Sequence, residues 1–290
     1  MERQGKPETP AIGELIRFYA DAGLDIALSD VPVDRFNEPP ARQNPAPAEK
    51  PAAAQAKQPP PRETAPAKEP PPVRPIARTV VPDDAAIANA REATRHAPTL
   101  DALKAQLSAF DGCGLKFTAK NLVFADGNPQ ADIMFVGEAP GRDEDIEGLP
   151  FVGRSGQLLN RMLAAIDIQR TDVYIANTIP WRPPGNRTPT PIETEICRPF
   201  IERQIELVAP KILVSLGGPA AKVLTGSTDG ILRMRGNWKT HTTAGGVEIP
   251  IMPTLHPAYL LRNPAQKRFA WRDLLAIKMR LNDIKGSRQD

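Results

Sequence analysis

The chain has 290 residues, a formal net charge of +3 and only two cysteines. Cys113 and Cys197 lie far apart in the sequence, which excludes a disulfide framework and favours a reducing compartment. The mild net charge does not by itself indicate a nucleic-acid partner. The N-terminus lacks the pattern of a signal peptide, and no apolar run is long enough to span a bilayer. We therefore expect a cytoplasmic protein without a membrane partner.

The first third of the chain differs in composition from the rest. Residues 14–20 (Glu-Leu-Ile-Arg-Phe-Tyr-Ala) place four large apolar side chains on a broad face, which predicts a short helix within residues 1–37. This helix either packs on the chain's own domain, which we favour, or binds another protein. Residues 38–95 are rich in proline and alanine, and they lack the apolar surface that would offset their ordering entropy. They predict a disordered linker.

Residues 96–290 alternate strand-like and helix-like patterns. Short, continuous apolar runs typical of buried strands occupy residues 133–136, 173–176, 212–216 and 249–252. Helical patterns follow at residues 156–166, 192–208, 219–224 and 266–281. Such alternation indicates an α/β fold, with a central, mostly parallel four-stranded sheet between two helical layers in a three-layer α/β/α arrangement.

Polar or tightly turning residues follow each predicted strand. Residues 137–141 (Gly-Glu-Ala-Pro-Gly) come after the first strand, Asn177 after the second, residues 217–218 (Gly-Gly) after the third and His256 after the fourth. The carboxyl ends of parallel strands form one edge of a sheet, where α/β proteins bind ligands. We therefore expect these residues to share a site.

The residue types at these positions suit a flat, polar ring. The Asn177 amide can both donate and accept hydrogen bonds, His256 can bind an oxygen that gains negative charge, and Phe151 offers a face for stacking. Each has a simpler interpretation: Phe151 as a core residue, Asn177 as a turn cap and His256 as a loop imidazole bonded to backbone. Their joint occurrence at successive strand ends favours the binding site.

Together these motifs resemble the uracil-DNA glycosylase superfamily, most closely its family 4, over about residues 109–273. The matching segments are 137–141 with Glu144-Asp145, 150–153 (Pro-Phe-Val-Gly) with 155–159 (Ser-Gly-Gln-Leu-Leu), Asn177 with 182–189, and 256–258 (His-Pro-Ala) with 260–262 (Leu-Leu-Arg). The resemblance implies a monofunctional enzyme of base excision repair, monomeric and nucleoid-associated. It would flip uracil out of single- or double-stranded DNA and hydrolyse the N-glycosidic bond, leaving an abasic site. The alternative is a weak or inactive protein of the same fold that binds damaged or abasic DNA.

The resemblance also implies roles for individual residues. Phe151 would stack on uracil, Asn177 would read its edge and His256 would stabilise the anionic base, with Gly137, Ala139 and Gly141 completing the base site. Ala139 stands where the first family has its catalytic Asp, so the candidate catalytic carboxylates are Glu138, for water positioning or sugar-cation stabilisation, and Glu144, as a pocket wall. Gly141 replaces an aromatic residue that excludes the thymine methyl in the first family, which implies looser base discrimination.

DNA contacts are expected from the loops around this site. Arg154, Ser155 and Gly156 begin a predicted helix, where phosphates bind readily. Further backbone contacts are expected from Arg182, Asn186, Arg187, Arg262 and Asn263. Leu260, or alternatively Tyr259, would be the wedge that replaces the flipped base.

Family 4 enzymes hold a four-iron, four-sulfur cluster on four cysteines, and this chain departs from that pattern. The corresponding positions here are Phe110, Cys113, Trp181 and Cys197. Two thiolates cannot replace four ligands. We therefore expect no iron-sulfur cluster, no other metal and no cofactor, with the two aromatic side chains filling the vacated volume.

Overall fold

The computed structural model describes residues 83–286, and the predicted helix at residues 14–20 and most of the predicted linker lie outside them. The folded part begins earlier than composition suggested. Helix α2 (Asp83–Arg95) occupies the last part of the predicted linker, and its Ala86 and Ala90 are buried in a cluster that includes side chains of α3 and α6. Alanine spaced one helical turn apart gives a narrow face that lets helices approach closely.

The sheet has six strands in the order β1-β3-β2-β4-β6-β5, so the prediction of four strands was incomplete. The central strands are parallel and match the predicted ones: β2 (Ile133–Gly137), β3 (Tyr174–Asn177), β4 (Ile212–Leu216) and β6 (Glu248–Thr254). The additional strands, β1 (Ala125–Gly127) and β5 (Lys239–Thr242), pair antiparallel at the two edges. Both are short and largely polar or exposed, which is why no apolar run marks them.

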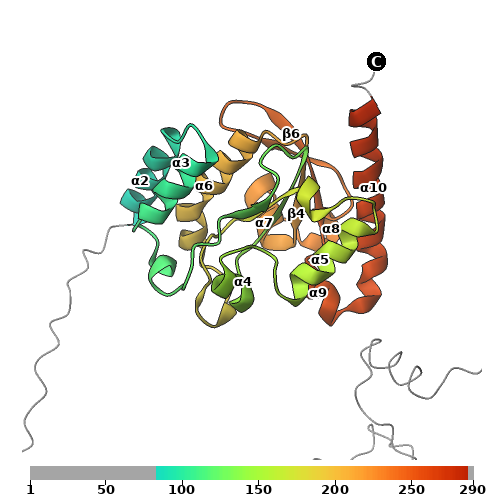
Figure 1. Ribbon diagram of the computed structural model, residues 1–290, viewed down its shortest axis with the longest axis horizontal. Helices are drawn as coiled ribbons and strands as arrows, with labels where there is room; N and C mark the ends of the chain where they lie inside the picture. Colours follow the sequence, from blue (N-terminus) through green and yellow to red (C-terminus); the bar gives the residue numbers. More distant parts are fainter. Residues whose placement is uncertain (1–82, 287–290) are drawn as a thin grey trace, which may run out of the picture. The chain divides into compact units, whose positions relative to one another are not determined.

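Helices cover both faces of the sheet, as expected from the alternating pattern (Figure 1). Along β2, Ile133 and Phe135 point to one face, and Met134 and Val136 point to the other. The first face packs against α5 (Arg154–Ala164), α9 (Pro257–Arg262) and α10 (Lys267–Gly286). The second packs against α6 (Pro191–Val208) and α7 (Gly218–Thr225), and α2 and α3 (Leu100–Ala109) pack on α6.

The remaining elements are short and lie in the connections. They are α4 (Arg142–Glu147), α8 (Ile231–Met234) and the 3-10 turns η1 (Gly114–Phe117), η2 (Arg170–Asp172), η3 (Pro184–Asn186) and η4 (Pro264–Gln266). Helix α6 begins with a capping box, in which Thr190 accepts a hydrogen bond from the Glu193 amide at 3.2 Å and Glu193 accepts one from the Thr190 amide at 2.7 Å.

No helix in residues 83–286 has the length and apolar content needed to cross a membrane.

Candidate functional site

A cavity of about 470 Å³ opens at the carboxyl ends of the parallel strands. Its walls come from segments far apart in the sequence, including Glu138 after β2, Asn177 at the end of β3, Gly217 after β4 and His256 after β6. Phe151, from the loop before α5, also lines it. The structure therefore brings together the residues that the strand-end pattern predicted to share a site.

The ring of Phe151 forms one wall of a narrow slot. Its centroid lies 5.6 Å from that of the His256 ring, with 31° between the planes. A Cβ atom placed on Gly137 would lie 2.6 Å from the Cζ atom of Phe151 and 2.4 Å from the Oδ1 atom of Asn177. Any side chain at position 137 would therefore collide with both residues, and the slot depends on glycine there.

The Asn177 side-chain amide makes no hydrogen bond to another residue in the part of the chain that the structure describes, and its atoms are not among the fully enclosed unpaired ones, because the residue lines the cavity. The residue is buried, and β-sheet pairing holds its backbone opposite Gly137. Buried amides are normally hydrogen-bonded. An amide that lines a cavity and has no protein partner is placed to bind a ligand that offers complementary donors and acceptors.

His256 is held in one orientation by its own helix. It is the N-cap of α9, and its Nδ1 atom accepts a hydrogen bond from the Ala258 amide at 3.1 Å. Burial, and to a lesser degree the nearby positive charge of Arg262, lowers the pKa of His256 to about 4. The ring is therefore neutral near pH 7, and with Nδ1 as an acceptor its proton resides on Nε2. The alternative interpretation, an imidazole bonded to backbone, is correct for Nδ1. The Nε2 atom remains available as a donor.

The two candidate carboxylates have different surroundings. Glu138 lines the cavity, burial raises its pKa, and its carboxylate has no hydrogen bond or ion pair with any described residue. Glu144 accepts three backbone hydrogen bonds, from the amides of Gly141 at 3.1 Å, Val152 at 3.2 Å and Gly153 at 3.1 Å. The carboxylate of Glu144 thus holds two loops of the cavity wall together, and Glu144 itself lines the cavity, the place expected of it as a pocket wall.

Gly141 and Ala139 line the same wall. A Cβ atom on Gly141 would lie 2.8 Å from the Oε2 atom of Glu144, so the glycine permits this hydrogen bond.

The basic residues around the cavity fall into two groups. Arg154 and Arg262 are exposed and make no ion pair within residues 83–286, and Ser155 lies beside them at the cavity rim. Their charges are accessible to a phosphate. Asn263 is also exposed, and its amide group donates to the Tyr259 carbonyl at 3.3 Å.

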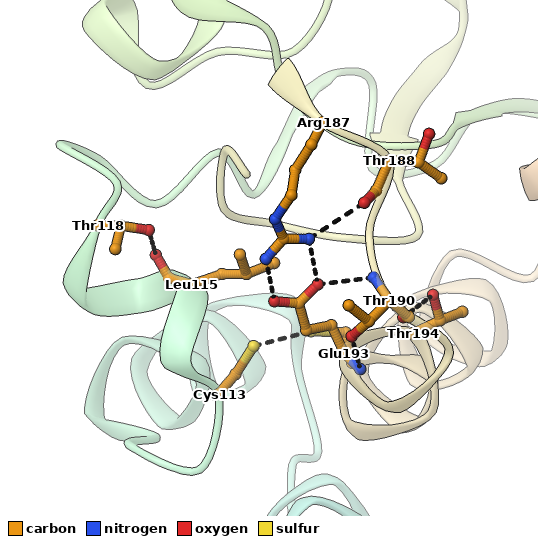
Figure 2. Close-up of polar contacts among 9 residues, drawn as sticks. Cys113, Leu115, Thr118, Arg187, Thr188, Thr190, Glu193 and Thr194 are labelled. Carbon is orange, nitrogen blue, oxygen red and sulfur yellow. Dashed lines mark hydrogen bonds and ion pairs between the residues drawn. The ribbon is translucent and has the colours of Figure 1, made fainter. Parts of the chain in front are cut away.

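Arg187 and Arg182 instead have protein partners. The Arg187 guanidinium donates to both carboxylate oxygens of Glu193, at 2.6 Å and 2.9 Å, as Figure 2 shows. This pairing raises the pKa of Arg187 and lowers that of Glu193. Arg182 donates to the Asn186 Oδ1 atom at 2.7 Å. These residues lie near the cavity as predicted, but part of their hydrogen-bonding capacity is already used.

Two of the predicted DNA contacts need correction. Leu260 is only 1% exposed and packs in the core cluster with α5 and α10, so it cannot serve as a wedge in this conformation. Tyr259, the alternative, lines the cavity, and Leu261 is also partly exposed. Gly156 is buried under Phe151 and serves close packing, since a Cβ there would lie 1.8 Å from the Phe151 carbonyl oxygen.

The two cysteines lie together in an apolar cluster and do not themselves line the cavity. The Sγ atoms of Cys113 and Cys197 are 3.8 Å apart, and both residues are fully buried. Trp181 and Phe110 belong to the same cluster, and the Phe110 ring packs edge-to-face on Phe200 with centroids 5.2 Å apart. The hydrogen bond between the thiols lowers the pKa of Cys113 and raises that of Cys197. No group of three or more potential metal ligands occurs among the described residues.

Arg170 is a residue of this region that sequence reasoning missed. Its guanidinium donates to the carbonyl oxygens of Pro150 and Phe151 from η2. Position 170 lies outside every motif, and no local pattern distinguishes it from an exposed arginine.

The cavity, lined by an aromatic ring, an unpartnered amide and a neutral imidazole, lies at the carboxyl edge of a parallel sheet, where α/β proteins bind their ligands. Residues 124–275 match the family model described as the uracil DNA glycosylase superfamily, and the chain belongs to this superfamily.

Several relatives are named type-4 uracil-DNA glycosylases. The chain is 41% identical to the one from Archaeoglobus fulgidus over 170 residues, covering 57% of this chain and 85% of that protein. It is 44% identical to the one from Thermotoga maritima over 155 residues, covering 52% of this chain and 77% of that protein. It is 38% identical to the one from Saccharolobus solfataricus over 188 residues, covering 63% of this chain and 87% of that protein.

Proposed function

We propose that the protein is a uracil-DNA glycosylase that hydrolyses the N-glycosidic bond of a flipped uracil and leaves an abasic site for base excision repair. One observation carries this proposal: Phe151, the unpartnered Asn177 amide and His256, whose Nε2 atom is left as a donor, line the same cavity. The names of the related proteins support the same substrate. A stacked base reaches such a slot only after it leaves the duplex.

Recognition of uracil rests on Asn177 and Phe151. Uracil offers a carbonyl and an imide N–H along one edge, and an amide side chain complements this pair with one donor and one acceptor. Cytosine offers an amino group at the carbonyl position, which leaves a mismatched donor in a buried site. Phe151 contributes an apolar face parallel to the base. The pair therefore selects a flat ring with the uracil pattern.

His256 stabilises the leaving group. As the bond from sugar to base breaks, negative charge develops on the uracil oxygens, and a hydrogen bond from Nε2 strengthens in step with that charge. The donor is the neutral imidazole, because the pKa of His256 is lowered to about 4. This interaction lowers the barrier without transferring a proton.

Glu138 acts on the sugar side of the bond. Its carboxylate borders the cavity without a protein partner in the described chain, and its raised pKa makes it a better proton acceptor. It positions the attacking water or stabilises the positively charged sugar. The cavity lining contains no lysine, so the amine nucleophile that a lyase requires is not supplied by the described residues. We therefore expect a monofunctional enzyme.

DNA binding comes from the rim of the cavity. Arg154, Ser155 and Arg262 contact backbone phosphates on either side of the flipped nucleotide. Tyr259 or Leu261 fills the space that the base leaves. The substrate is single- or double-stranded DNA, and the enzyme acts as a nucleoid-associated, cytoplasmic monomer.

We also propose that the protein works without an iron-sulfur cluster. Two thiols 3.8 Å apart, in a cluster that contains Trp181 and packs against Phe110, supply half of the four ligands that such a cluster requires. Aromatic packing stabilises this part of the fold instead. Purified protein should lack iron and near-visible absorbance, and Cys113→Ala and Cys197→Ala should retain uracil excision. A brown, iron-containing preparation would overturn this proposal.

The main test is release of uracil from a labelled oligonucleotide, with and without alkali. We expect strand breaks only after alkali, and loss of most excision in Asn177→Ala. Asn282→Ala, on the exposed side of α10, is the matched control and should behave as the parent protein. Tight binding of abasic DNA without uracil release would favour the alternative of a damage-binding protein. Breaks without alkali would show a lyase.

A further inference from the structure

The guanidinium of Arg170 is bonded on every side. Its Nη2 atom donates to the Pro150 carbonyl at 2.6 Å, and its Nη1 atom donates to the Phe151 carbonyl at 3.1 Å. Nε donates to the Asp126 carboxylate at 2.7 Å, and Nη1 also donates to the Asn160 Oδ1 atom at 2.9 Å. Asp126 belongs to the edge strand β1 and Asn160 to α5. Arg170 thus links β1 and α5 to the loop that carries the stacking ring.

That loop holds Phe151 in an unusual backbone conformation. Its φ angle is +54°, in the left-handed region that residues with a Cβ atom seldom adopt. Such a conformation persists only when the surrounding structure enforces it. The enforcing contacts therefore determine where the ring of Phe151 points.

Three contacts hold the peptides on either side of the Phe151 Cα atom, and one of them is the hydrogen bond from the Val152 amide to Glu144 at 3.2 Å. Arg170 binds the carbonyl oxygens before and after the Phe151 Cα atom. The first turn of α5 packs directly on the same peptide, because Gly156 has no side chain and a Cβ there would lie 2.1 Å from the Phe151 carbonyl carbon. Of these contacts, Arg170 is the one that binds the carbonyl oxygens on both sides of the Phe151 Cα atom.

We propose that Arg170 is a positioning residue for uracil excision: it fixes the Phe151 peptide, and through it the plane of the ring on which the flipped base stacks. This inference rests on the proposed function. Arg170 does not line the cavity, so it acts through Phe151 and not by contact with the base. Without its guanidinium, the Phe151 peptide can rotate out of the left-handed region, and the ring tilts away from the His256 ring.

Loss of the Arg170 guanidinium should slow the chemical step and leave the affinity for DNA unchanged. Of the proposed phosphate contacts, Arg262 lies on α9, outside the loop that carries Phe151. A base that is bound but stacked on a tilted ring sits out of line with His256 and Glu138. Misplacement of reacting groups by about 1 Å can slow a reaction about 100-fold.

The test compares Arg170→Met with Arg203→Met. Arg203 is a matched control because it is also partly buried and binds one backbone carbonyl, of Ala97, and one carboxylate, of Glu206, but it lies on α6. We expect Arg170→Met to lower the single-turnover excision rate by about 10- to 100-fold, with little change in the affinity for uracil-containing DNA. Arg203→Met should lower the melting temperature and leave the rate unchanged. Arg170→Lys, which keeps the positive charge on a single ammonium group, should recover part of the rate.

A second readout does not depend on activity. The chain contains only three histidines, so the ring protons of His256 can be followed by NMR and assigned with His256→Asn. The Phe151 ring, 5.6 Å away, shifts these signals. Arg170→Met should move them toward their positions in Phe151→Leu, and Arg203→Met should not.

The outcomes separate the two proposals. If Arg170→Met matches the parent protein in both rate and His256 signals, or if its rate falls only as far as that of Arg203→Met, Arg170 is not a positioning residue. If the parent protein releases no uracil, the proposed function fails, and the NMR comparison alone decides whether Arg170 orients the ring.

Discussion

Replacing Glu144 by glutamine tests whether this buried residue positions the cavity loops or takes part in the reaction. One oxygen of its carboxylate accepts from the amides of Val152 and Gly153, and the other accepts from the amide of Gly141. A glutamine has one oxygen and one NH2 group, so at least one backbone N–H must face another donor. Charged hydrogen bonds contribute about 1.5–3 kcal/mol each, and a buried unpaired donor costs a similar amount.

Loss of one bond and creation of one donor–donor contact should together lower the free energy of unfolding by roughly 3 kcal/mol. For a folded region of about 200 residues this lowers the melting temperature by about 6–12 °C. Glu147→Gln is the control, because Glu147 is an exposed carboxylate in the same helix, α4. Its melting temperature should stay close to that of the parent protein.

The assay combines thermal unfolding with single-turnover excision at a temperature where the variant is folded. We expect a clear loss of stability with a moderate loss of rate. An unchanged melting temperature together with near-complete loss of excision would refute this reasoning, because it would show that Glu144 acts on the reaction itself.

Two further predictions follow from charge. Excision requires ionised Glu138, and burial raises the pKa of this residue. The excision rate should therefore fall on acidification at a pH above the usual range of a glutamate, and Glu138→Gln should abolish this dependence. An inflection that is unchanged in the variant would contradict the assignment. His256 has a pKa of about 4 when folded and about 6.5 when unfolded, so the unfolded chain binds more protons between these values. The free energy of unfolding should therefore decrease as the pH falls through that window. Urea unfolding at pH 7 and pH 5 measures this decrease, which should be smaller in His256→Asn than in the parent protein.

The salt dependence of DNA binding provides another comparison in the same assays. Arg262→Ala should lower the slope of log K against log salt concentration by about 1, because Arg262 has no ion-pair partner within residues 83–286. Arg187→Ala should lower it less, because Glu193 already neutralises that charge. Equal effects would mean that DNA displaces Glu193.

The central sheet could be predicted from the sequence because its strands are buried on both faces. A strand of that kind is a continuous apolar run, and such a run is visible without knowledge of its neighbours. The run at residues 133–136 became β2 (Ile133–Gly137), and the run at residues 212–216 became β4 with the same bounds. The residues that follow such strands must meet at one edge, which is why Asn177 and His256 could be assigned to one cavity.

The edge strands and α2 could not be predicted in the same way. β1 and β5 are short, and their side chains are mostly not buried, so pairing with β3 and β6 defines them more than their own composition does. Helix α2 is rich in alanine and follows a proline-rich stretch, and its packing in the cluster with α6 distinguishes it from the linker. Both depend on contacts with residues distant in the sequence.

The chemistry of the site was likewise divided between sequence and structure. The sequence indicated several side chains that line the cavity, because Glu138, Asn177 and His256 each follow a predicted strand. Only the tertiary structure decided the protonation, contacts and exposure of these side chains. The Nδ1 hydrogen bond and burial keep His256 neutral, and backbone amides bind the Glu144 carboxylate. Leu260 is buried, and Arg170 binds the Phe151 backbone. Protonation, exposure and backbone strain arise from surrounding atoms, and folding brings those atoms from segments that no local pattern connects.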